Sequence, residues 1–179
     1  PNIHASTIAG GKSHLIGVVV FGLTNQYFSD LLTQVEAYCN TLGYSTVVMF
    51  TGKDHQKEIQ CIQNLYYLSV DGIVLCPCNS GDAFENFLLS LDIPIVTFGN
   101  KLSNFPYVGI DNAAAMEETL AHILNAGYDR LVYVRPELKQ KNSFAQQERL
   151  AAFIKVCEKN HIAYCVTDLP NAESGLDRN

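Results

Sequence analysis

The sequence predicts an α/β fold in which a parallel sheet is flanked by helices. Short apolar runs rich in β-branched residues recur along the chain, the first at 16–21, and such runs are typical of strands buried on both faces of a parallel sheet. Between them lie segments with apolar residues at three- and four-residue spacing, which is the pattern of an amphipathic helix. The two kinds of segment alternate to the end of the chain, and this alternation favours parallel α/β architecture.

Local signals place the elements of the first part of the chain. Gly22 ends the first apolar run, Gly43 ends the first helical stripe, and Asp54 stands where it can cap the next helix. Pro94 lies near the start of a strand, where a missing N–H is tolerated. The predicted elements are, in order, a strand at 16–21, a helix at 26–42, a strand at 45–50, a helix from 54 to near 69, a strand at 70–76, a helix at 82–90 and a strand at 93–98.

The last part of the chain continues the same alternation. A polar loop at 99–106 and a short extended piece at 107–110 lead into it. The predicted elements that follow are a helix at 112–126 that ends at Gly127, a strand at 131–134, a helix at 144–160 and a final strand at 162–166.

Composition excludes several classes of protein. The 179 residues carry a net charge of −6, which argues against a nucleic-acid surface spread over the whole molecule but leaves room for one at a terminus. No apolar run approaches the ~20 residues that span a bilayer, and no signal segment opens the chain, so we expect no membrane partner. The six cysteines lie mostly within apolar runs and lack zinc-site spacing, which predicts reduced, buried thiols in a cytoplasmic protein.

The usual catalytic signatures are missing from the sequence. Gly11-Lys12-Ser13 is similar to the end of a phosphate-binding loop, but Ser6 stands where that loop needs glycine, and the triplet precedes a strand. No GxGxxG, GxSxG or HExxH motif occurs, and Asp111 and Glu117-Glu118 have no visible partner for acid–base chemistry. We therefore predict that the chain is not an enzyme and holds no cofactor or metal.

Eight short segments stand in a characteristic order. They are Pro1–Ile8 (PNIHASTI), Ser13–Val19 (SHLIGVV), Asn25–Phe28 (NQYF), Val70–Val74 (VDGIV), Ile93–Val96 (IPIV), Val108–Asn112 (VGIDN), Leu124–Leu131 (LNAGYDRL) and Arg149–Phe153 (RLAAF). Together, in this order and spacing, they resemble the ligand-responsive core of the LacI/GalR family of bacterial transcription regulators. The resemblance covers nearly the whole chain.

The resemblance implies two periplasmic-binding-protein-like lobes that close over a small effector, usually a sugar or a nucleobase. Residues 1–14 would be the hinge that joins a helix-turn-helix head to the core, 15–110 the first lobe, and 111–179 the beginning of the second. Because two lobes of roughly 120–150 residues each need a longer chain, and because Pro1 rather than methionine stands first, we expect a part of a longer polypeptide with an incomplete second lobe.

The same resemblance implies a set of effector-binding residues. They are Phe21, Asn25, Tyr27, Phe28, Cys76, Gly99, Asn100, Ser143 and Arg149. Aromatic rings would stack on the effector, amides would orient it, and the guanidinium of Arg149 would bind hydroxyl pairs, carboxylates or phosphates. Gly99-Asn100 departs from the Asp-Arg that family members often carry, and this departure removes a strong acceptor for sugar hydroxyls.

Several of these residues also have a structural interpretation, and that of Ser143 is a helix cap. Phe21 and Phe28 are equally suited to the core, and Asn25 to a helix cap. Arg149 is also placed to form a surface ion pair with Glu148 or Glu158. In the hinge, the resemblance gives Ile8 the position of an aliphatic wedge that enters the minor groove of DNA, with Asn2 and Ala5 beside it. The alternative is a linker that meets no DNA.

Three functions are compared on this basis. The first is the effector-sensing and dimerising core of a LacI-type repressor, with operator DNA and a second copy as partners. The second is a periplasmic-type sugar-binding protein for transport, which the missing signal segment, the cysteines and the hinge disfavour. The third is a small flavodoxin-like enzyme, which would need an acidic cluster where Phe21-Gly22 stand. The sequence leaves the effector, the operator and the sign of the response open.

Overall fold

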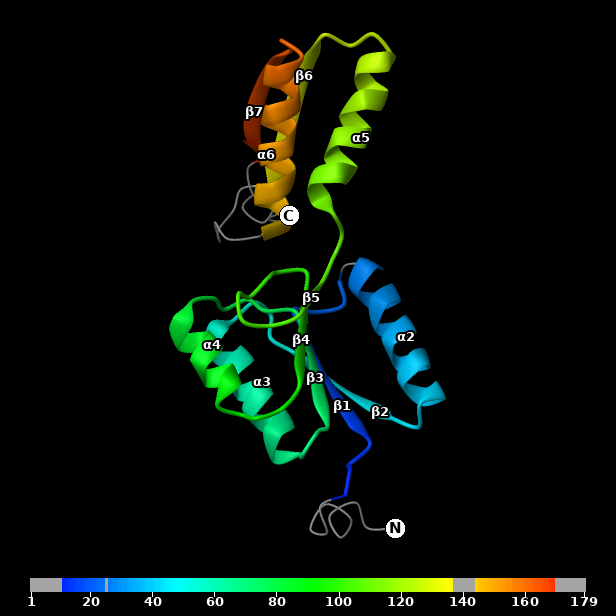
Figure 1. Cartoon of the computed structure of the whole chain (residues 1–179), viewed down its shortest axis with the longest axis vertical. Helices are drawn as coiled ribbons and strands as arrows, with labels where there is room; N and C mark the ends of the chain where they lie inside the picture. The colour runs from blue at the N-terminus through cyan, green and yellow to red at the C-terminus, as the bar shows by residue number, and fades with distance from the viewer. Residues whose placement is uncertain (1–10, 25, 137–143, 170–179) are drawn as a thin grey trace, which may run out of the picture. The chain divides into compact units, whose positions relative to one another are not determined.

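The computed structural model describes residues 11–24, 26–136 and 144–169. Among these residues no helix is both long and apolar enough to cross a membrane. The elements are, in chain order, β1 (Leu15–Val20), α2 (Gln26–Thr41), β2 (Ser45–Phe50), α3 (His55–Tyr67), β3 (Gly72–Leu75), α4 (Asp82–Leu89), β4 (Ile95–Phe98), β5 (Tyr107–Val108), α5 (Asn112–Asn125), β6 (Arg130–Pro136), α6 (Phe144–Lys159) and β7 (Ala163–Leu169), as drawn in Figure 1.

The chain forms two compact units, Pro1–Gly109 and Ile110–Asn179. The first unit contains a five-stranded sheet in the order β2-β1-β3-β4-β5, and every pairing within it is parallel. Helix α2 covers one face of this sheet, and α3 and α4 cover the other (Figure 1). The alternation of strands and helices in the sequence predicted this class of fold, and the prediction is confirmed.

Strand β1 occupies a central position because its side chains serve both faces of the sheet. Val18 and Val20 pack in the cluster that includes α2, whereas Val19 packs in the cluster that includes α3 and α4. Successive side chains of a strand point to opposite faces, so a strand between two helical layers needs an uninterrupted apolar run. The helix α2 meets this strand with the predicted apolar stripe, of which Phe28, Leu31 and Val35 belong to the cluster.

The second unit is smaller. Its strands β6 and β7 pair in parallel, with Tyr133 opposite Val166. A core forms where Leu120 of α5 and Phe153 and Cys157 of α6 are buried against one face of this pair.

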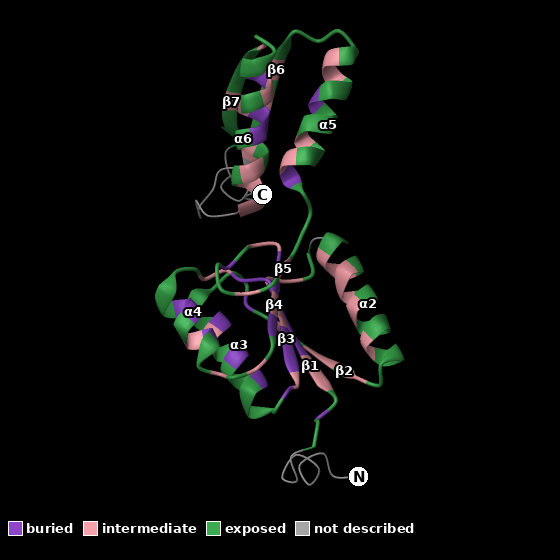
Figure 2. Ribbon diagram, in the orientation of Figure 1, coloured by how far each residue is buried: buried purple, intermediate pink, exposed green. Residues whose placement is uncertain are grey.

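The other face of β6 and β7 is exposed in the described structure. Val132 is 63% exposed, Val134 49% and Leu169 55%, and the two strands show long stretches of exposed and half-buried residues in Figure 2. Residue pairs on this face are in register, Val132 with Cys165 and Val134 with Thr167. An apolar face of two paired strands is therefore open to solvent.

Several predicted boundaries were wrong by a few residues. β6 and β7 extend to Pro136 and Leu169, beyond the predicted ends at 134 and 166, because their pairing continues to that point. α3 ends at Tyr67, since the next residues turn and Ser69 has a positive φ of 55°. β3 and β4 are shorter than predicted, at four residues each.

The predicted burial of the cysteines is correct for three of them. Cys61, Cys76 and Cys157 are buried, Cys39 and Cys78 are half-buried, and all six thiols are free. Cys165 is exposed, because it lies on the face of β7 that the described elements leave uncovered.

Candidate ligand-binding site

The carboxyl ends of β1, β3 and β4 lie side by side in the first unit, because these three strands are parallel neighbours. Ligands of open α/β sheets bind outside this edge, between the loops that leave the strands. Six of the predicted ligand residues belong to the segments that follow these three strands: Phe21, Tyr27, Phe28, Cys76, Gly99 and Asn100. The structure thus places them at one edge of the sheet.

Aromatic rings form a continuous group at this edge. The ring centroid of Phe28 lies 5.8 Å from that of Phe21, 5.4 Å from that of Tyr27 and 6.2 Å from that of Phe98, and all three pairs meet edge to face. Phe98 is buried, Phe21 and Phe28 are half-buried, and Tyr27 is exposed. Phe21 and Phe28 therefore pack against the core, as their structural interpretation predicts; their role in binding an effector stays a prediction.

The backbone explains why glycine stands at position 99. Gly99 has a φ of +73°, and a Cβ there would lie 3.0 Å from the sulfur of Cys76. Any larger residue would strain the backbone and crowd a buried thiol. The side-chain amide of Asn100 donates to the carbonyl of Pro77 at 2.8 Å, so this polar residue is held against the loop that follows β3.

Two thiols beside this edge, Cys76 and Cys78, have raised pKa values. Burial, together with the nearby Glu58 carboxylate, raises the pKa of the Cys76 thiol to about 12. Burial and Glu58 raise the pKa of the Cys78 thiol to about 12 as well. Because the thiolate is the nucleophilic form, the raised pKa favours the neutral thiol at Cys76. Cys76 is also 1% exposed and packs in the core with Val18, Val20 and Phe98.

Two buried glutamates fix the loops of the site, and the sequence analysis missed both. Glu58 of α3 is fully buried and accepts hydrogen bonds from the backbone N–H groups of Cys78 and Asn79, at 2.7 and 2.8 Å, and from the Asn79 amide at 2.8 Å. Glu85 of α4 holds the loop after β4 in the same way, through the N–H groups of Ser103 and Asn104 and the Asn104 amide.

The second unit carries the predicted arginine. Nε of Arg149 donates to Oδ1 of Asn112 at 2.8 Å. Asn112 is 2% exposed, and its amide nitrogen donates to the carbonyl of Ile110 and to Glu148, both at 3.1 Å. Within the described residues, the predicted ion pair of Arg149 with Glu148 or Glu158 is absent, because Asn112 stands between the arginine and Glu148.

Two of the carboxylates that the sequence left without partners, Asp111 and Glu117, have structural ones. Asp111 caps α5 by accepting from the N–H of Ala114 at 2.9 Å. Glu117 forms an ion pair with Lys155 at 3.1 Å. No group of three or more His, Cys, Asp or Glu side chains that could hold a metal ion occurs in the described part of the chain.

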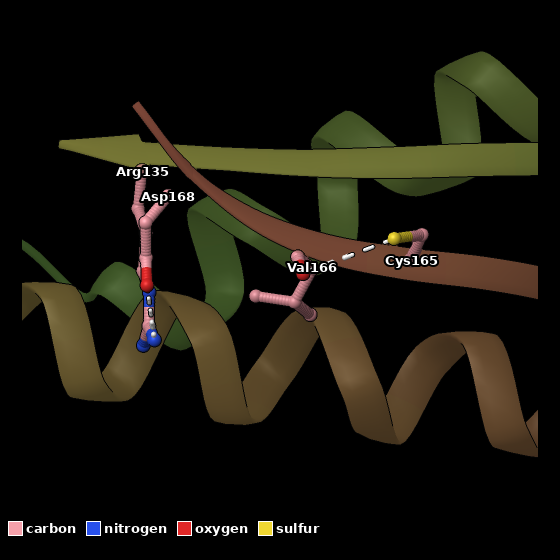
Figure 3. A network of polar contacts seen from close by, with 4 residues as sticks. All are labelled: Arg135, Cys165, Val166 and Asp168. Carbon is pink, nitrogen blue, oxygen red and sulfur yellow. Dashed lines mark hydrogen bonds and ion pairs between the residues drawn. The ribbon is translucent and has the colours of Figure 1, made fainter. Parts of the chain in front are cut away.

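An ion pair joins Arg135 and Asp168 near the carboxyl ends of β6 and β7, and Figure 3 shows it beside α6. The two residues are opposite each other in the register. The hydrogen bond from Arg135 lowers the pKa of Asp168, and the same contact raises the pKa of Arg135. The partners are far apart in sequence, so no local signal predicted this pair.

The remaining predicted residues do not belong to this edge of the sheet as described. Asn25 and Ser143, and the hinge residues Asn2, Ala5 and Ile8, lie outside the described residues. Arg149 belongs to the second unit and the six residues of the sheet edge to the first. Of the predicted ligand residues, the structure therefore brings together the six described ones of the first unit.

A separate hollow of ≈ 400 Å³ lies between α2 and the edge strand β2. None of the predicted ligand residues lines it. Its lining consists of Leu23, Ser29, Leu32, Thr33, Glu36, Thr46, Val48 and Phe50.

Comparison with known proteins gives a consistent result. The model of the family described as periplasmic binding proteins and sugar binding domain of LacI family matches residues 13–177. The chain is 34% identical over 155 residues to the transcriptional regulator PtxS of Pseudomonas plecoglossicida, a match that covers 86% of this chain. It is 27% identical over 155 residues, again 86% of this chain, to the sucrose operon repressor of Klebsiella pneumoniae. The chain spans 45% of the length of each relative.

Solved structures support the fold. A periplasmic binding protein/LacI transcriptional regulator from Alkaliphilus metalliredigens, complexed with D-xylulofuranose, matches with a TM-score of 0.75 and 23% identity, over 87% of this chain and 56% of that one. The Cra regulator of Pseudomonas putida, in complex with fructose 1-phosphate, matches with a TM-score of 0.76 and 16% identity, over 87% and 57%. Because the family model covers nearly all of the sequence, the chain belongs to the family of periplasmic binding proteins and sugar-binding domains of LacI-type regulators.

Proposed function

We propose that the chain is the effector-sensing and dimerising core of a LacI-type transcription regulator. The observation that carries the proposal is the family match over residues 13–177, together with relatives that are named as transcriptional regulators. The arrangement of Phe21, Tyr27 and Phe28 at the carboxyl edge of the sheet supports it, because such an edge with aromatic rings suits a small ring-shaped ligand.

In this proposal the two lobes are 15–110 and 111–179, and a small effector such as a sugar binds to residues of both. Effector binding favours one arrangement of the lobes. That arrangement alters how the hinge, with Asn2, Ala5 and Ile8, presents itself to operator DNA in a homodimer. DNA affinity then changes by the ratio of the effector's affinities for the two arrangements. Such a regulator acts in the cytoplasm, where its operator is, and does no catalysis.

The two other functions have less support. A periplasmic sugar-binding protein for transport shares the family model, but the relatives named above are regulators of transcription. A small flavodoxin-like enzyme shares only the alternation of strands and helices. Neither is favoured by a contact of the described residues.

The proposal is tested by thermal-shift screening of this chain and of the full product of its gene against sugars, sugar acids, sugar phosphates and nucleobases. A ligand at 100 times its Kd stabilises a competent fold by about 2.7 kcal/mol. We expect Arg149→Ala to abolish the thermal shift. Arg130→Ala, at the first residue of β6, is the control and should preserve it. If no compound stabilises either protein, or if the shift survives Arg149→Ala, the proposed site is wrong.

A further inference from the structure

The loops that follow β3 and β4 are each held by a glutamate at the same place in a helix. Glu58 is the fourth residue of α3, and Glu85 is the fourth residue of α4. Both side chains are buried, with 0% and 5% of their surface exposed. Because a buried carboxylate is costly to keep without several donors around it, the donors indicate what each glutamate does.

The donors of the two carboxylates form the same pattern. Each carboxylate accepts from the backbone N–H groups of two successive loop residues, one on each oxygen, and from the side-chain amide of the second residue, which is an asparagine. The donors are Cys78 and Asn79 for Glu58, and Ser103 and Asn104 for Glu85, at distances from 2.7 to 3.1 Å. The same arrangement therefore occurs twice, once for each loop.

Asn100 joins the two loops to each other. Its side-chain amide nitrogen, in the loop after β4, donates to the carbonyl of Pro77 in the loop after β3, at 2.8 Å. The backbone beside it also approaches the other loop, since a Cβ at Gly99 would lie 3.0 Å from the sulfur of Cys76. The two carboxylates and the two loops are thus linked into one connected set of contacts.

These contacts leave the two loops little freedom to change shape. A carboxylate that accepts from two successive N–H groups fixes the backbone of both residues, and breaking such bonds in a buried place leaves donors without partners. A ligand that binds at this edge of the sheet therefore meets loops that are already ordered. The free energy of ordering them is not subtracted from its binding free energy.

We propose that Glu58, Asn100 and Glu85 are positioning residues that hold the loops after β3 and β4 as one preassembled wall of the ligand site. This role differs from the effector contact that the resemblance implies for Asn100. The inference rests on the proposed function in one respect, which is that it treats this edge of the sheet as the ligand site.

Amide hydrogen exchange, measured by NMR on the ¹⁵N-labelled chain, follows each loop separately. Glu58→Gln has the same shape as the natural side chain, but it replaces one acceptor oxygen by an NH₂ group. At least one of the N–H groups of Cys78 and Asn79 then loses its acceptor. We expect exchange at that group to become about tenfold faster or more, while exchange in β1 changes by less than about twofold.

The corresponding change in α4 is the matched comparison. Glu85→Gln should accelerate exchange at Ser103 or Asn104 most, whereas Glu58→Gln should accelerate it most in the loop after β3. Because glutamine fills the same volume as glutamate, a role in packing alone would leave the loop amides unchanged, and that result would overturn the inference. If exchange in β1 rises as much as in the loops, the glutamates stabilise the fold as a whole, and the inference is overturned as well.

Asn100→Ala tests the link between the loops. We expect it to accelerate exchange about three- to tenfold at the amides of both loops, because each loop loses its contact with the other. Asn40→Ala is the control, since Asn40 is exposed on α2, and it should change neither loop. An effect of Asn100→Ala on the loop after β4 alone would refute the single wall.

The exchange measurements use the chain without a ligand, so their outcome is separate from that of the thermal-shift screen. If the loops behave as expected and no compound stabilises the chain, the positioning of the loops stands and the ligand site is wrong. If a compound stabilises the chain but the loop amides do not respond to these variants, the regulator function stands and the preassembled wall is wrong.

Discussion

Replacing Glu58 by alanine tests how the loops of the candidate site are held. The change removes the acceptor of three hydrogen bonds in a fully buried environment. Each buried donor left without a partner costs about 1–3 kcal/mol, and partial entry of water reduces the sum. We expect Glu58→Ala to lower the free energy of unfolding by about 3–5 kcal/mol, a large fraction of the 5–15 kcal/mol that stabilises a typical domain.

Urea unfolding followed by circular dichroism at pH 7 measures this loss. Glu36→Ala is the matched control, because Glu36 is exposed on α2 and its hydrogen-bond partner is the exposed side chain of Asn40; its effect should stay within about 0.5 kcal/mol. A cost below about 1 kcal/mol for Glu58→Ala would show that the loop after β3 does not depend on this carboxylate.

The same variant has a chemical readout at Cys78. Burial, followed by the Glu58 carboxylate, raises the pKa of this thiol to about 12. Without the carboxylate we expect the pKa to fall, so that Cys78 reacts faster with a thiol reagent at pH 8 to 9. An unchanged rate in the folded protein would contradict the electrostatic part of the argument.

Three further changes test the two units. Partial burial acts to raise the pKa of Asp71, but hydrogen bonds from Ser13 and His14 outweigh it and lower the pKa; its stabilisation is therefore complete above the unfolded pKa of about 3.9 and disappears as the pH falls through the folded value. Asp71→Asn should cost about 1–2 kcal/mol at pH 7 and almost nothing near pH 2, and an equal cost at both would refute this assignment. Gly17→Ala should cost about 1–3 kcal/mol in urea, since its Cβ would lie 2.6 Å from Leu65; a neutral effect would show that Leu65 repacks. Phe153→Ala should cost about 3–5 kcal/mol in the unfolding of the second unit, and an unchanged midpoint would show that its core lies elsewhere.

Local sequence patterns were sufficient for the layers of the first unit. The apolar run of β1 and the apolar stripe of α2 are both local patterns. In α2, for example, Phe28, Leu31 and Val35 lie within two helical turns of each other. The spacing of such apolar residues indicates which side chains are buried. The alternation of strands and helices predicts that the strands are parallel. Phe21 and Gly99, which follow two of these strands, are then expected at the carboxyl edge of the sheet.

The polar contacts of the site were harder to predict from the sequence. Glu58 was detectable in principle, because it shares a helix face with Ile62 and Leu65, and a charge on an apolar face indicates buried donors nearby. The bond between Asn112 and Arg149 joins positions 37 residues apart, and no local pattern encodes it. The end of β7 was misjudged for a similar reason, since it depends on the register with β6.

The exposed face of β6 and β7 determines how the isolated chain should behave in a cell. Val132, Val134 and Leu169 form an exposed apolar surface on a two-stranded sheet. A sheet of two strands is only marginally stable by itself. Open strand edges and apolar side chains together promote aggregation and attract chaperones. We therefore expect the second unit to open before the first, to bind hydrophobic dyes, and to set the rate at which proteases remove the chain.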